Sequence, residues 1–191
     1  MKKILITLLV VMVAAGSMSA KDAASAKKAN AKKEYTHSIG LVGGSGIALQ
    51  YKQMIRDHFT MIEEFGYGYC ISQAASASGF GNYSGAINTI VLAYQNKCAE
   101  GKGIRLDYFI GGQFKVGYTG AAGMPGGLFG SGLAVGIEAK MKNAPIAFSF
   151  DFRPGYACQI FGGGGGIGID HLFDYTFNLG VRYTLPMPKK K

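Results

Sequence analysis

Apolar and polar residues alternate along most of this chain, which is the pattern of a β-strand with one apolar face. Residues 173–185 show it most clearly. There, every odd-numbered residue is apolar or aromatic, and every even-numbered residue is polar or Gly. The pattern predicts an all-β fold.

Eight segments carry this alternation. It is clear in residues 104–118, 133–138, 146–153 and 173–185, and weaker in residues 36–43, 47–53, 59–69 and 86–95. In the segment 59–69, Glu63 and Glu64 are adjacent, so one of them falls on the apolar face unless a bulge intervenes. Eight antiparallel strands of about 10 residues fit a soluble sandwich, a soluble lipocalin-like barrel or a membrane barrel.

Three features favour the membrane barrel. Large aromatic residues lie near strand ends, as membrane interfaces prefer, at Tyr118, Tyr156, Phe173 and Tyr183. The polar faces combine Gly and Ala with charges of both signs, which suits a narrow interior. Long Gly-, Ser- and Ala-rich segments (71–85, 119–129, 159–172) alternate with short charged ones (55–57, 96–102, 142–144), as external loops and periplasmic turns do.

We therefore expect an eight-stranded antiparallel up-and-down transmembrane β-barrel over residues 35–185. After residue 15 no apolar run approaches the roughly 20 residues of a membrane-spanning helix, which excludes a helical membrane protein. A soluble periplasmic barrel that binds an apolar ligand is the alternative use of the same strands.

The two ends of the chain differ from the body. Lys2 and Lys3, the apolar residues 4–15 and the small residues that follow have the layout of a secretory signal peptide, so we expect residues 1–20 to be removed. Residues 21–34 carry five lysines and predict a flexible basic tail, and residues 186–191 predict a second one. These tails are candidates for contact with peptidoglycan or acidic lipid headgroups.

The chain's formal net charge of +9 is concentrated in these terminal segments. Residues 35–185 hold ten basic and nine acidic residues, so the body is almost neutral. A nucleic-acid partner needs positive charge gathered on a folded surface. We therefore predict no nucleic-acid binding.

Three stretches resemble small outer-membrane β-barrel proteins of Bacteroides-type bacteria. They are residues 37–52 (HSIGLVGGSGIALQYK), like an opening hairpin, and residues 130–154 (GSGLAVGIEAKMKNAPIAFSFDFRP) with 177–185 (FNLGVRYTL), like a closing half. The resemblance implies an outer-membrane location, with membrane lipid and the barrel-assembly machinery as partners. The resemblance implies little about chemistry. From the sequence as a whole we predict a structural or loop-presenting role, in adhesion or ligand contact, without catalysis.

The polar faces of the strands predict a charged barrel interior. Its members, with charges of both signs close to balance, are Lys52, Glu63 (or its neighbour Glu64), Arg105, Asp107, Lys115, Glu138, Lys140, Asp151, Arg153, Asp174 and Arg182. We expect a packed network of ion pairs, because an eight-stranded barrel is only just wide enough for its own side chains. The alternative is a narrow, porin-like pore for small solutes or ions, lined by the same residues.

No residue pattern predicts catalysis, a metal or a cofactor. The spacings of His37, His58 and His171 match no metal-ligand motif. His37 and Ser38 are neighbours in sequence, and a lipid-modifying enzyme would need such a pair to act together. Consecutive strand residues, however, point to opposite faces. The glycines at 162–166 are not followed by the Lys-Ser or Lys-Thr of a phosphate-binding loop.

Three cysteines face an oxidising compartment, where pairing is the rule. Cys70 and Cys158 end strands at the external rim, whereas Cys98 lies at a periplasmic turn a membrane thickness away. We expect either a Cys70–Cys158 disulfide or three free thiols, and no bridge to Cys98.

Overall fold

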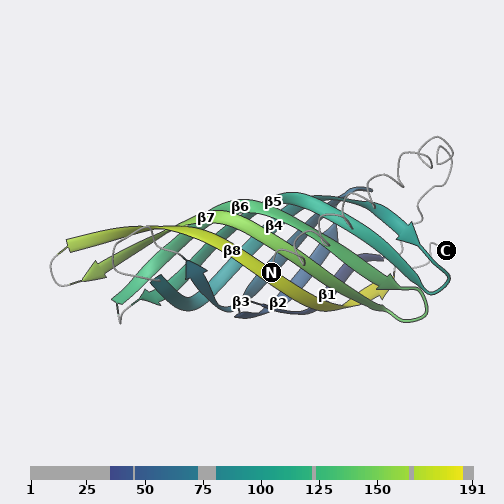
Figure 1. Ribbon diagram of the computed structural model, residues 1–191. Helices are drawn as coiled ribbons and strands as arrows, with labels where there is room; N and C mark the ends of the chain where they lie inside the picture. Colours follow the sequence, from purple (N-terminus) through teal and green to yellow (C-terminus); the bar gives the residue numbers. More distant parts are fainter. Residues whose placement is uncertain (1–34, 45, 73–80, 122–123, 164–165, 187–191) are drawn as a thin grey trace, which may run out of the picture. The chain divides into compact units, whose positions relative to one another are not determined.

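The computed structural model describes residues 35–44, 46–72, 81–121, 124–163 and 166–186. They form one closed barrel of eight antiparallel strands, in which each strand pairs with its neighbours in sequence and β8 pairs with β1 (Figure 1). The strands are β1 (Tyr35–Gly43), β2 (Gly46–Met54), β3 (Phe59–Ser72), β4 (Gly81–Glu100), β5 (Ile104–Ala121), β6 (Met124–Met141), β7 (Ile146–Gly163) and β8 (Gly166–Pro186). The predicted fold class is confirmed.

Alternation in the sequence becomes an inner and an outer face of the barrel wall. On β8, Phe173 and Leu179 are 66% and 67% exposed, whereas Asp174 and Arg182 between and beyond them are 2% and 1% exposed. The other strands follow the same rule, so the charged face lies inside and the apolar face outside. This is the reverse of a soluble barrel, whose apolar side chains fill the interior.

Short turns join β2 to β3, β4 to β5 and β6 to β7 at one end of the barrel, which we call the turn end. The backbone N–H of Ile55 donates to the Phe59 carbonyl at 2.9 Å, and that of Gly101 donates to the Ile104 carbonyl at 2.8 Å. Both the first and the last strand also reach this end, because Tyr35 pairs with Pro186. We call the opposite end the far end.

The long loops predicted at residues 119–129 and 159–172 are wrong. β5 runs to Ala121 and β6 begins at Met124, and β7 runs to Gly163 and β8 begins at Gly166. Glycine-rich composition suggested loops, but a ladder is built from backbone groups, and glycines such as Gly126 and Gly168 pair with Phe161 across it. For the segment 71–85, β3 ends at Ser72 and β4 begins at Gly81, and residues 73–80 lie outside the described part.

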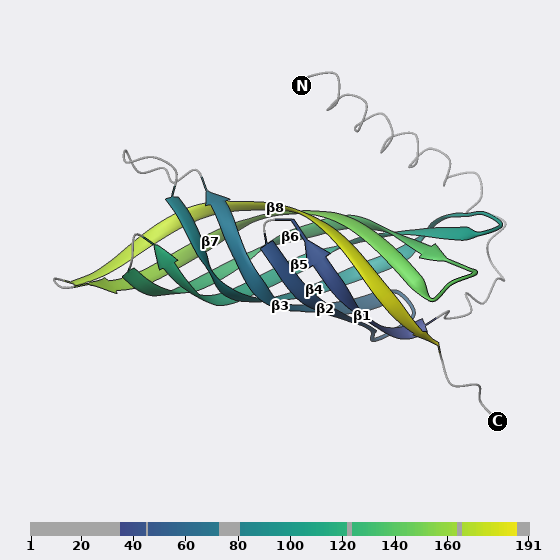
Figure 2. The same cartoon turned by 90° about the horizontal axis from the view of Figure 1, so that it is seen from below.

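The strands differ in length at the far end. β1 and β2 have nine residues each, whereas β8 has 21. β1 therefore pairs with β8 only up to Leu179, and β8 continues to Gly166 along β7 alone. Figure 2 shows the β1–β2 hairpin ending part of the way along the barrel, with β3 and β8 continuing past it.

A small apolar cluster occupies part of the barrel interior. It consists of Ile62, Val91, Ala93, Phe109 and Ala134, all of them buried. Phe109 breaks the alternation of β5 by placing a ring on the polar face, and Gly136 makes room for it: a Cβ added there would lie 2.5 Å from the Phe109 ring. Along β5 this ring lies between the charges of Asp107 and Lys115.

Residues 1–34 and 187–191 lie outside the described residues, so the signal peptide and the two basic tails stay predictions. In the described part of the chain there is no helix long and apolar enough to cross a membrane.

Candidate functional site: the charged interior

One carboxylate, Glu138 on β6, collects donors from around the barrel wall near the turn end. Lys52 Nζ on β2 donates to it at 2.5 Å, and Arg182 on β8 donates through Nη2. Three further groups surround it: the Tyr35 hydroxyl, Gln95 Nε2 at 3.3 Å and Lys140 Nζ at 3.4 Å. Because these residues come from β1, β2, β4, β6 and β8, a single side chain ties five strands together.

Asp107 on β5 extends this group towards the mouth at the turn end. It accepts from Lys140 Nζ at 2.6 Å, from Arg105 Nε at 2.7 Å and from Gln95 Nε2 at 3.1 Å. Asp107 is buried, whereas Arg105 is partly exposed at the mouth. We refer to Tyr35, Lys52, Gln95, Arg105, Asp107, Glu138, Lys140 and Arg182 as the turn-end cluster.

A second group of charges lies towards the far end. Arg153 on β7 donates from Nη1 and Nη2 to the two carboxylate oxygens of Glu64 on β3, both at 2.6 Å, and from Nε to Asp151 at 2.6 Å. Asn178 adds a bond to Asp151 at 2.9 Å, and Lys115 pairs with Asp174. We refer to Glu64, Lys115, Asp151, Arg153, Asp174 and Asn178 as the far-end cluster.

Gln50 on β2 joins the two clusters. Its Nε2 donates to Glu64 at 2.5 Å, and its Oε1 accepts from Arg182 Nη1. The amide is suited to this position because it offers a donor to the carboxylate and an acceptor to the guanidinium. Hydrogen bonds through Gln50 therefore connect the turn-end cluster to the Glu64–Arg153 part of the far-end cluster.

The network nearly balances its own charge. The two clusters contain six cations and five carboxylates. Removing a charge from water costs several kcal/mol unless a partner and hydrogen bonds compensate, so a buried set of this size requires pairing of this kind. The geometry can hold eight strands in register, but it leaves few charges free to attract a passing ion.

A cavity of about 70 Å³ lies in the far half of the interior. Its wall includes Glu64, Lys115, Arg153 and Asp174, together with Val42 and Ile47 near the tip of the β1–β2 hairpin. None of the turn-end cluster residues lines it. The cavity is therefore a pocket within one half of the barrel, with room for a few water molecules.

The structure corrects one residue of the predicted interior. Glu63 lies outside, exposed, and Glu64 takes the inward position, because β3 turns Ile62 and Glu64 to the same face. The remaining predicted residues lie inside: Lys52, Arg105, Asp107, Lys115, Glu138, Lys140, Asp151, Arg153, Asp174 and Arg182.

Sequence reasoning overlooked Tyr35, Gln50, Gln95 and Asn178 as members of the network. Gln50 and Gln95 are spaced by two residues from inward Lys52 and Ala93, so strand parity alone could have found them. Tyr35 was hidden by an irregularity in pairing between Tyr35 and His37, which turns its ring inward.

The histidine side chains lie outside the barrel interior and are not part of the network. His37 is on the outer side of β1, where Nδ1 is 2.7 Å from the Tyr51 hydroxyl, while Ser38 is fully buried on the inner side. His58 contacts the Gln95 carbonyl, and His171 contacts the Tyr156 hydroxyl. Among the described residues, no group of three or more His, Cys, Asp or Glu side chains is placed to hold a metal ion.

Cys98 and Cys158 are free thiols in the structure. Cys158 is on β7 and Cys70 is on β3, and these strands are separated by three others in either direction around the barrel. The predicted Cys70–Cys158 disulfide is therefore not formed, since it would have to cross the interior or a strand end. The other expectation, free thiols, describes Cys98 and Cys158; the side chain of Cys70 lies outside the described residues.

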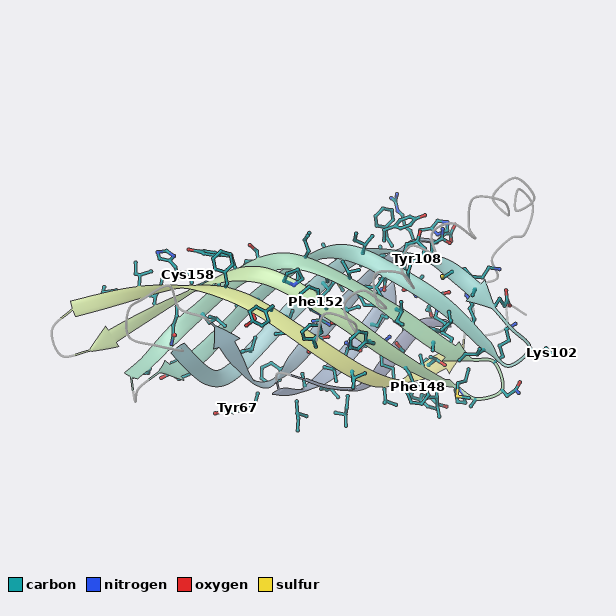
Figure 3. The ribbon with its side chains drawn as sticks, in the orientation of Figure 1. Tyr67, Lys102, Tyr108, Phe148, Phe152 and Cys158 are labelled. Atoms are coloured by element: carbon teal, nitrogen blue, oxygen red, sulfur yellow. The ribbon has the colours of Figure 1, made fainter. Side chains whose placement is uncertain are left out.

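The outer surface carries aromatic side chains towards both ends of the barrel. Tyr94 and Tyr108 lie near the turn end, and Tyr67 and Tyr118 lie near the far end. Figure 3 shows Tyr67 and Tyr108 on the outer surface, on opposite sides of the barrel. Between the two ends the exposed residues are mostly Ile, Leu, Val and Phe, which form what we call the apolar band.

Charged residues return beyond the band at the turn end. Glu100, at the end of β4, pairs with Lys142 at 2.6 Å and with Lys97 at 2.9 Å. Hydrogen bonds from Lys142 and Lys97 lower the pKa of the Glu100 carboxyl to about 2. The surface at this end of the barrel is therefore charged, as expected for a surface in contact with water.

No family model matches the chain, and no curated protein matches it. Among solved structures it is similar to a major outer membrane protein from Thermus thermophilus, at 8% identity and a TM-score of 0.47, over 78% of this chain and 98% of that one. Neisserial surface protein A matches at 9% identity and a TM-score of 0.38, over 78% and 93%. Ail, the attachment invasion locus protein of Yersinia pestis, matches at 14% identity and a TM-score of 0.30, over 78% and 93%. These values do not transfer a function, and the family resemblance stays a prediction.

Proposed function

We propose that this protein is a structural β-barrel of the bacterial outer membrane that presents its far-end strands and their connections, and whose interior is closed to solutes. The observation that carries the proposal is the reversed polarity of the barrel, with an ion-pair network inside and an apolar band outside. An apolar surface on all sides of a barrel is unfavourable in water and favourable in hydrocarbon. Closed barrels leave no unpaired strand edge in the lipid, as a bilayer requires.

The arrangement of the interior supports a closed barrel over a pore. Glu138 and Arg153 each bond to side chains on other strands across the lumen, so the interior is crossed by side chains at both clusters. An ion moving through would have to displace these buried pairs, and separating buried charges from their partners is costly. In this proposal the barrel anchors the protein rigidly in the membrane, and any external partner binds at its far end.

The remaining parts of the proposal concern partners. Membrane lipid contacts the apolar band, and the barrel-assembly machinery inserts the chain. The basic tail, residues 21–34, approaches peptidoglycan or acidic headgroups on the periplasmic side through its lysines. Adhesion or ligand contact is made by the strands and connections at the far end. In this proposal the far end of the barrel faces the external medium.

The first experiment is fractionation of cells that express the full chain, combined with gel migration of unboiled and boiled samples. Recovery in the outer membrane with a heat-dependent shift in migration is the expected result. Release with the soluble periplasm and no shift would overturn the proposal and would favour a periplasmic barrel.

Conductance separates the closed barrel from the pore. The purified protein in planar bilayers should give no steady single-channel current, and neither should variants at the turn-end mouth such as Arg105→Ala. A steady current that changes on substituting Arg105 or Asp151 would show that the interior conducts.

A further inference from the structure

Glu63 occupies an unusual place on the outer surface. It lies on β3 halfway between the exposed aromatic residues Phe59 and Tyr67, four residues from each, or about 13 Å along the strand. Within the described part of the chain, it is the one charged side chain on the outer face of the apolar band. Ionisable residues facing lipid are costly, and they mark sites where a second group compensates them.

Nothing within the described barrel compensates Glu63. Its neighbours on the adjoining strands are Tyr51 on β2 and Ile90 on β4. The Tyr51 hydroxyl lies 2.7 Å from His37 Nδ1, and no hydrogen bond or ion pair joins Glu63 to a described residue. Lipid tails offer no hydrogen-bond donor to compensate the carboxylate.

We propose that Glu63 marks a lateral contact between two copies of this chain, in which Glu63 of each copy accepts a hydrogen bond from Tyr51 of the other. The inference rests on the membrane location proposed above. Two copies inserted in the same direction are related by an axis along the membrane normal, so each residue meets residues of its own depth. Tyr51 is the direct cross-strand partner of Glu63 and lies at nearly that depth.

Self-complementarity is what selects a second copy over another partner. A two-fold contact uses the same patch on both subunits, so the patch must carry both a donor and an acceptor. Tyr51 and Glu63 supply them side by side, and the neighbouring Leu49, Phe65 and Leu92 are exposed apolar side chains that can pack around the pair. The hydroxyl can keep its contact with His37, because it accepts as well as donates.

Cysteine cross-linking in membranes tests the contact. In a background with Cys70, Cys98 and Cys158 changed to Ser, Leu49→Cys should form a cross-linked dimer, and Ile137→Cys, which is exposed on β6, should not. Equal cross-linking at both positions, or a product whose mass is not that of two copies, would overturn the proposal.

Substitution of the pair gives the second arm. Glu63→Leu and Tyr51→Phe should each weaken dimerisation roughly tenfold, the effect of losing two symmetric hydrogen bonds of the strength found in membranes. Glu63→Gln should retain most of the dimer, because its amide oxygen still accepts. Heat-dependent migration of each variant shows that the barrel has folded.

The two proposals fail separately. Absence of the protein from the outer membrane would remove the proposed function and this contact with it. Outer-membrane recovery with a dimer fraction unchanged by Glu63→Leu would overturn the contact alone.

Discussion

Arg153 on β7 and Glu64 on β3 are joined by two parallel hydrogen bonds of 2.6 Å across the barrel interior. The two residues are 89 positions apart in sequence and on strands that are not neighbours in the sheet. Fork-to-fork pairing of guanidinium and carboxylate fixes geometry as well as charge. The pair therefore braces opposite walls of the barrel where backbone ladders do not.

Breaking this brace should destabilise the barrel strongly. Arg153→Leu leaves Glu64 and Asp151 buried without their cation, and we expect a loss of about 3–5 kcal/mol in the free energy of unfolding. Urea unfolding in lipid vesicles measures it. The double variant Arg153→Leu with Glu64→Leu should lose less than Arg153→Leu alone, and Arg105→Leu, at the partly exposed mouth, should lose about 1 kcal/mol. Equal losses in all three would contradict the bracing role.

Glu138 and Glu63 provide a matched comparison of one substitution on two faces. Glu138→Gln removes the charge that Lys52, Lys140 and Arg182 surround, so we expect a loss of about 3 kcal/mol or more. Glu63→Gln removes a charge from the outer face and should leave the stability of the monomeric barrel unchanged or raised. The same unfolding assay in dilute detergent micelles compares them; a larger loss for Glu63→Gln would mean that the two faces are assigned wrongly.

Packing around the Phe109 ring can be tested by substituting Gly136, which lies against it. A Cβ at residue 136 would lie 2.5 Å from the Phe109 ring and 2.7 Å from the Asp151 Cβ, so Gly136→Ala should destabilise by about 1–3 kcal/mol. Phe109→Leu, combined with it, should recover part of that loss because the ring no longer fills the space. Additive losses in the double variant would show that Gly136 is needed for another reason.

The orientation of the barrel can be determined from its thiols. Cys158 is towards the far end of β7 and Cys98 is near the turn end of β4. In a Cys70→Ser background, a membrane-impermeant maleimide on intact cells should label Cys158 and should label Cys98 only after the outer membrane is permeabilised. Labelling of Cys98 alone in intact cells would reverse the orientation.

The contacts of Glu100 with Lys97 and Lys142 predict how the stability of the barrel depends on pH. The lowered pKa of Glu100, about 2, means that the carboxyl stays ionised in the folded state while it would protonate near pH 4.5 in the unfolded chain. Any stability it contributes is therefore present above pH 4.5 and is lost as the pH falls towards 2. Carboxyl NMR titration should place its midpoint near 2, and Lys142→Gln should move the midpoint upward. A titration midpoint that is unchanged by Lys142→Gln would show that the hydrogen bond from Lys142 does not lower the pKa of Glu100.

The sequence by itself determined the barrel wall. Strand existence, the sorting of residues between two faces and the charged character of one face all follow from a period of two residues, which is local. Residues such as Asp174 and Arg182 could be assigned to the interior because their neighbours leave only one consistent face. The count of strands followed from the eight segments that carry this alternation.

Only the tertiary structure decided how the interior is connected. The choice between Glu63 and Glu64 depends on the pairing of β3 with both its neighbours, since the sequence places acids at two successive positions. The strands continue through glycine-rich segments because neighbouring backbones pair there, which composition does not record. Partners such as Tyr35 and Glu138 lie 103 residues apart, and the stagger of eight strands around a closed barrel is what brings them together.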